Sequence, residues 1–138
     1  MTDETLSTKE VVGGILYSVK KQLGQPPEST EFDVDLIIHI NSAINTLSQL
    51  GIGPEEGFIV ESNDETYEDY LGEDYLGRGM VSLYIFYMTK LGFDGSDLPS
   101  TLVQLLNQKT KELEWRLMQL QQDLDAKKGG GDDGNFSP

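Results

Sequence analysis

The fold is decided by Met80–Leu91, which reads MVSLYIFYMTKL. Apolar side chains occupy almost every position of this stretch, so a helix over about 76–91 is apolar on nearly all of its faces. Such a helix has to be covered on several sides. We therefore expect it to be the central helix of the protein, with part of its surface covered by neighbouring subunits. The glycine-containing segment 92–97 that follows predicts a turn.

Three other segments repeat apolar residues at three–four spacing and predict helices over about 7–23, 32–50 and 99–126. In the second of these, the buried stripe is formed by Leu36, Ile37, Ile40, Ile44 and Leu47. The last segment begins near Pro99, which is a favoured first helical position. About 28 residues rising 1.5 Å each give roughly 42 Å. A domain of this size does not need so long a helix for its own core, so we expect its far end to project.

The beginning of the chain carries one helix signal and one conflict. Ser7 and Glu10 have the spacing of a capping box, in which each side chain bonds a backbone N–H at the helix start. Gly13 and Gly14 then fall inside the predicted helix, where each costs about 1 kcal/mol relative to alanine. A close helix–helix contact and a mobile first helix both explain that cost.

A long acidic loop is predicted between the second and third helices, because residues 51 to about 73 show no helical period. Loops of this length are usually functional or disordered. Inside it, Thr66–Leu71 has the pattern of a single helical turn, with Tyr67 and Leu71 packing inward.

The last residues, 127–138, are rich in glycine and aspartate and predict a flexible tail. The sequence as a whole predicts an all-α fold. Residues 1–126 form a small four-helix bundle with the acidic loop and a long, projecting C-terminal helix, and the tail follows.

The composition limits the function. The chain has 24 acidic and 10 basic residues and a net charge of −14. This negative charge argues against tight binding of nucleic acid, because phosphate contacts need clustered Lys and Arg. The acidic surplus fits a surface past which DNA slides, a surface that docks on a basic partner, or simple solubility.

Cysteine is absent, which excludes disulfides, thiolate metal sites and a cysteine nucleophile. No apolar run reaches the roughly 20 residues of a membrane span, and the acidic first residues do not predict a signal peptide. We therefore expect a protein that stays inside the cell producing it, without a membrane partner.

No residue pattern predicts catalysis or a cofactor. His39 is the only histidine, and alone on a helix it is better interpreted as an ordinary, partly buried side chain than as a zinc ligand or a base. Nucleotide-binding and nucleophile motifs are missing. The acids of the loop could form a calcium site, but their spacing is not that of a calcium-binding helix–loop–helix, so a solvated acidic loop is favoured.

Three stretches together carry a family resemblance: DLIIHINSAI…LSQLGIG (35–53), LYIFYMTKLGFD (83–94) and KELEWRL (111–117). In this order the chain resembles the head–tail connector proteins of siphophages, the adaptors or head completion proteins that bind beneath the portal. The resemblance covers about residues 32–118. The chain departs from the pattern at 95–97, where the turn is looser, and in the glycine-rich tail, which has no match.

The resemblance implies an all-helical, non-enzymatic virion protein of a bacteriophage. Such subunits form a homo-oligomeric ring, usually a dodecamer, between the portal protein and a stopper or tail-completion protein. DNA passes through the channel without specific binding. The location is the head–tail interface of the virion, with assembly in the host cytoplasm. The alternative from another class is a phage-encoded inhibitor that mimics DNA charge; it would stay monomeric or dimeric and bind a basic enzyme.

Three sets of residues are candidate contacts. The expected subunit interface uses faces of the third and fourth helices, with Tyr84, Tyr87, Met88 and Trp115. For Trp115, packing within its own domain is the other interpretation. The expected portal-binding residues at the end of the last helix and in the tail are Leu120, Leu124, Lys127, Lys128 and Phe136. The expected acidic surface toward the channel or the next ring comprises Asp64, Glu65, Glu68, Asp69, Glu73 and Asp74.

Overall fold

The computed structural model describes the backbone of residues 14–136 and the side chains of residues 14–128. Along the chain the elements are α2 (Ile15–Gln22), α3 (Asp33–Gln49), α4 (Tyr67–Leu71), α5 (Arg78–Asp94), the short 3-10 helix η1 (Gly95–Asp97) and α6 (Ser100–Phe136). Over this part of the chain there is no strand, and one isolated bridge joins Gly14 to Thr66. The all-α prediction is confirmed.

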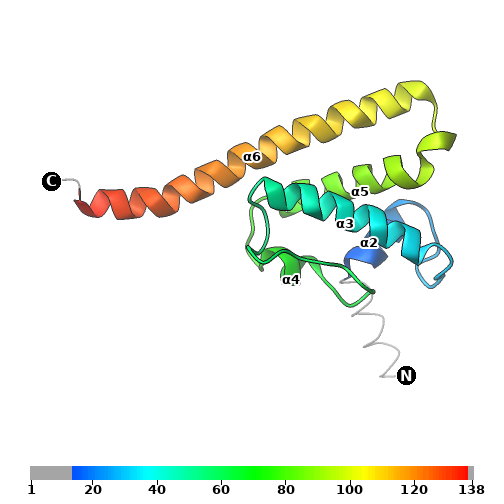
Figure 1. Ribbon diagram of the computed structural model, residues 1–138, viewed down its shortest axis with the longest axis horizontal. Coiled ribbons are helices and arrows are strands. Elements are labelled where there is room, and N and C mark those ends of the chain that lie inside the picture. Colours follow the sequence, from blue (N-terminus) through cyan, green and yellow to red (C-terminus); the bar gives the residue numbers. More distant parts are fainter. Residues whose placement is uncertain (1–13, 137–138) are drawn as a thin grey trace.

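The middle position belongs to α5, as the sequence predicted. It packs along α3 and α6 and also contacts α2 (Figure 1). Its side chains Val81, Tyr84, Ile85 and Thr89 are buried. The surrounding helices bury one stripe each. In contrast, α5 is covered from several directions, because its sequence leaves few polar faces.

The core draws on α2, α3 and α5 more than on α6. The predicted stripe of α3 is buried, with Ile37 half-buried at its edge. From α6, Leu106, Leu113 and Leu117 are buried, and among its described side chains none beyond Leu117 is. Figure 1 shows the C-terminal part of α6 extending past the bundle, so its predicted projection is confirmed in the backbone.

The prediction for the first helix is corrected at Gly14. This residue is extended (φ −76, ψ 145) and precedes the first residue of α2 instead of lying inside a helix. The physical reason is that the N–H of Ile15 donates to the carbonyl of Glu65, at 2.9 Å, in the acidic loop. Ser7, Glu10 and Gly13 lie outside the described residues.

Two further predictions about the helices need correction. The described residues form five α-helices instead of four, because the single turn expected in the loop is the separate helix α4. In addition, α5 continues to Asp94 and includes Gly92. A Cβ at Gly92 would lie 2.3 Å from Nδ1 of His39, so glycine is needed for the close approach of α5 to α3.

The last helix is longer than predicted. Its backbone continues past residue 126 to Phe136, through the glycines of the tail. Adding residues to an existing helix is easier than nucleating one, which is why poor helix formers can extend a long helix. That residues 127–138 are flexible in solution stays a prediction.

Candidate functional site

The candidate functional features of this protein are surfaces on which apolar and charged side chains are exposed. Within residues 14–128, no group of three or more His, Asp or Glu side chains is arranged to hold a metal ion. No helix in the described part of the chain is long and apolar enough to cross a membrane. What remains to be explained is where apolar and charged side chains are exposed.

The outer side of α5 carries exposed apolar residues. Leu83 lies two positions from both Val81 and Ile85, about 200° around the helix from these buried residues. It is 37% exposed, and Leu76, just before the helix, is 73% exposed. Phe86 and Tyr87 are half-buried beside it, with ring centroids 5.7 Å apart. We call Leu76, Leu83, Phe86 and Tyr87 the α5 patch.

A second exposed apolar pair lies on α3. Ile38 is two positions from both Leu36 and Ile40, which are buried, so it points away from the core. Ile38 is 59% exposed and Val34, one turn earlier, is 73% exposed. We call Val34 and Ile38 the α3 patch. The α3 patch and the α5 patch therefore lie on two different helices, and each faces away from the buried stripe of its own helix.

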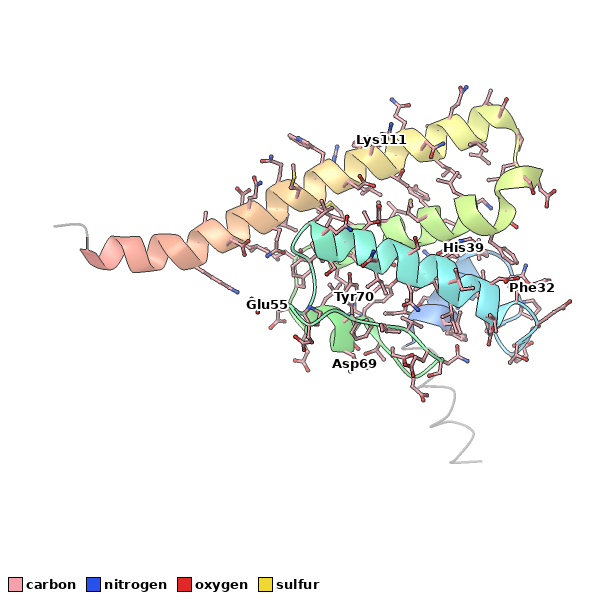
Figure 2. The ribbon with its side chains drawn as sticks, in the orientation of Figure 1. Phe32, His39, Glu55, Asp69, Tyr70 and Lys111 are labelled. Carbon is pink, nitrogen blue, oxygen red and sulfur yellow. The ribbon has the colours of Figure 1, made fainter. Side chains whose placement is uncertain are left out.

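On α6 the large exposed apolar residues are Leu105, which is 47% exposed, and Trp115. The position of Trp115 is the more informative. Trp115 lies two positions from both Leu113 and Leu117, on the side of α6 opposite the buried stripe. Its side chain is 60% exposed, so most of the indole does not pack inside its own chain. Figure 2 shows Lys111, one turn earlier, also on the outer side of α6.

Tyr84 occupies a different place from the other expected interface residues. It is fully buried between α5 and α6, and its hydroxyl donates to Oε2 of Glu114 at 2.6 Å. Burial, and next the bond to Glu114, raise the pKa of this phenol well above its ordinary value, so it remains a donor. Tyr84 therefore has no exposed surface to offer a neighbour, whereas Tyr87 and Met88 are half-buried against the core.

A side chain of α3 bonds the backbone of the acidic loop. The amide of Asn41 donates to the carbonyl of Val60 at 2.9 Å and accepts from the N–H of the same residue at 2.8 Å. The side chain therefore bonds Val60 as a neighbouring strand would. Beside it, Phe58 stacks on Tyr70 of α4, with ring centroids 4.9 Å apart. Tyr70 lies between α4 and α3 (Figure 2).

Three of the six loop acids also fold the loop. Glu65 accepts hydrogen bonds from the N–H groups of Glu61 and Ser62, both at 3.1 Å. Asp69 forms a capping box with Thr66 at the start of α4. Glu68 pairs with Arg78 of α5. The remaining acids of this set are exposed: Asp64, Glu73 and Asp74. The loop is thus an ordered element whose own carboxylates hold its turns.

The root of the projecting part of α6 is fixed to the α4–α5 connection. The hydroxyl of Tyr75 donates to Oε1 of Gln121 at 2.8 Å, and Nε2 of Gln121 donates to Asp125 at 3.0 Å. Of the expected portal-binding residues, Leu120 and Leu124 are half-buried here, and Lys127 and Lys128 are exposed. The side chain of Phe136 lies outside the described residues.

Sequence reasoning missed the α3 patch, Leu76, Leu83 and the loop contact of Asn41. Leu83 and Ile38 could have been found from their positions, since each lies two residues from both neighbours in a buried stripe. The Asn41–Val60 contact has no local signal, because it joins residues 19 positions apart.

Comparison with known proteins gives one result. No curated protein and no solved structure matches the chain. The family model described as phage connector protein matches residues 15–123, which include α2, the acidic loop, α3 to α5 and the first two-thirds of α6. Since this match covers most of the sequence, the chain belongs to the phage connector protein family.

Proposed function

We propose that this connector subunit acts as one member of a homo-oligomeric ring, an adaptor beneath the portal that links the phage head to the tail and forms part of the DNA channel. The family implies a structural, non-catalytic role at the head–tail junction. The ring, the portal and a stopper or tail-completion protein as partners, and a twelvefold symmetry are the finer parts of this proposal.

The observation that carries the ring is the position of the exposed apolar residues. The α5 patch and the α3 patch lie on different helices, and both are exposed. Two different exposed patches suit a heterologous contact, in which one patch of a subunit packs against the other patch of the next subunit. Such contacts produce a ring when the rotation closes.

The large exposed fractions of these apolar side chains also support an assembly. Val34, Ile38, Leu76 and Trp115 are each 59–73% exposed in a chain of 138 residues. Single exposed apolar residues are ordinary, but apolar side chains that share a face mark interaction surfaces. We propose that neighbouring subunits cover the α5 patch, together with Met88, and that Trp115 of α6 contributes to the same assembly.

The charge distribution supports a channel role for the loop. A ring of subunits with a net charge of −14 each, with Asp64, Glu73 and Asp74 exposed on the loop, would repel the phosphate backbone. The loop then lies toward the channel or the next ring, and the end of α6 reaches the portal. An acidic inhibitor that mimics DNA remains the alternative; the connector family favours the ring.

Electron microscopy of the purified protein, alone and with its portal, tests this function. Leu83→Asp and Ile38→Asp place a charge in the α5 patch and the α3 patch, and each should prevent ring formation while helicity is retained. Asn107→Asp is the matched control, because Asn107 is exposed on α6, outside both patches, and the change adds the same charge. Rings at wild-type yield from both patch variants would refute the proposed contact. A monomer that never assembles on portal would refute the ring.

A further inference from the structure

A groove of about 490 Å³ lies where the projecting part of α6 passes the turn after α3 and the short helix α4. Apolar side chains line much of it: Pro54, Tyr70, Leu71, Tyr75 and Leu124. Lys127 and Lys128, on α6, also line it and are exposed. Both lysines and Leu124 lie beyond residue 123, where the family match ends.

The walls of the groove are fixed before anything binds. Tyr75, Gln121 and Asp125 form the hydrogen-bonded chain that ties α6 to the α4–α5 connection. On the opposite wall, Gly53 has φ +92, and a Cβ there would lie 2.6 Å from Cε1 of Tyr70. Glycine is therefore needed for the turn to close on the Tyr70 ring, and a groove with fixed walls loses little entropy when it is occupied.

The side chains that line the groove include two ammonium groups and no carboxylate. Within residues 14–128, no carboxylate lies within ion-pair distance of the ammonium groups of Lys127 and Lys128. The hydroxyl of Tyr70 is buried and has no hydrogen-bond partner in the same part of the chain. Burial raises the pKa of this phenol, so it stays protonated. The nearby carboxylate of Asp125 already accepts from Gln121.

We propose that this groove binds an extended acidic segment of a neighbouring head or tail protein, with a large apolar side chain seated against Leu71, Tyr75 and Leu124 and carboxylates paired with Lys127 and Lys128. Two adjacent cations beside an apolar lining suit this chemistry, because an ion pair fixes direction and the apolar side chain supplies burial. The assignment of this segment to a head or tail protein rests on the proposed function. The groove and the chemical class of its ligand do not depend on it.

A direct titration tests the groove with the full-length protein. The probe is a short fluorescein-labelled peptide that alternates glutamate with leucine and phenylalanine, and the readout is fluorescence anisotropy at low and at physiological salt. We expect saturable binding that weakens with salt. Replacing each glutamate of the probe by glutamine should weaken binding about tenfold, since two exposed ion pairs contribute roughly this much.

Matched variants locate the binding. Lys127→Ala with Lys128→Ala should weaken binding about tenfold, and Lys109→Ala with Lys111→Ala, the same charge change elsewhere on α6, should leave it unchanged. Loss in both pairs would mean nonspecific attraction and overturn the proposal. Unchanged binding in the first pair, or no saturable binding up to millimolar peptide, would also overturn it.

Two further measurements separate peptide binding in the groove from nucleic-acid binding and from ring formation. A single-stranded oligonucleotide is titrated in parallel, and tighter binding of the oligonucleotide than of the peptide would show that the lysines serve nucleic acid instead. Ring assembly of the Lys127→Ala/Lys128→Ala variant is followed by electron microscopy. Intact rings whose peptide binding is about tenfold weaker are expected, so a failure of the groove and a failure of the ring are seen separately.

Discussion

Replacing Asn41 by alanine should detach the acidic loop from α3. The amide of Asn41 makes both of its bonds to the backbone of Val60, whose side chain is fully buried. Without the amide, one N–H and one carbonyl lose their partners. An unpaired buried polar group costs about 1–3 kcal/mol. Because Asn41 is only half-buried, water reaches part of the site, and we expect a loss on the order of 2–4 kcal/mol in the free energy of unfolding.

Urea unfolding followed by far-ultraviolet circular dichroism measures this loss, and amide hydrogen exchange locates it. Exchange should speed up around Val60 and in the turn held by Glu65, whereas α5 should keep its protection. Asn45→Ala is the matched control: this asparagine is one turn along α3 and exposed, so its change should stay within about 0.5 kcal/mol. Equal stability of the two variants, with unchanged loop exchange, would refute the assigned role of Asn41.

Three other changes test the packing. Lys20 is 1% exposed, and its ammonium lies 2.6 Å from the carboxylate of Asp33. Lys20→Met should lower the free energy of unfolding in urea by about 3 kcal/mol. Adding Asp33→Asn should restore part of this loss, and no restoration would exclude a charge effect. Gly92→Ala should cost about 1–3 kcal/mol by forcing α5 away from His39, and a melting temperature equal to that of wild type would contradict this close contact. Truncation after Leu117 should leave a folded, helical subunit that no longer binds portal in a pull-down; undiminished portal recovery would turn attention to the loop.

The helices were predictable because their signal is local. The buried stripe of α3 appears in the sequence as a three–four repeat, and the structure buries those residues with Ile37 at the margin. The projection of α6 followed from length alone, since 1.5 Å per residue exceeds what a small bundle needs. The capping box of Thr66 and Asp69 likewise marks a helix start within four residues.

The surfaces were harder to predict because their signal is not local. In Met80–Leu91 almost every residue is apolar, so the sequence could not tell which face meets the protein's own core. The structure shows that Tyr84 faces inward, bonded to Glu114, whereas Leu83 one position earlier faces outward. Gly92 looked like part of a turn, although its role is to admit His39 between α3 and α5 (Figure 2).

The acidic loop shows why counting charges is not enough to design a test of the channel. The carboxylates of Glu65 and Asp69 accept hydrogen bonds from backbone N–H groups, and Glu68 pairs with Arg78. Replacing these residues would change the shape of the loop together with its field. Asp64→Asn, Glu73→Gln and Asp74→Asn change the field alone, because these three side chains are exposed and hold no described turn. Only that combined variant separates electrostatic repulsion of DNA from the architecture that positions the loop.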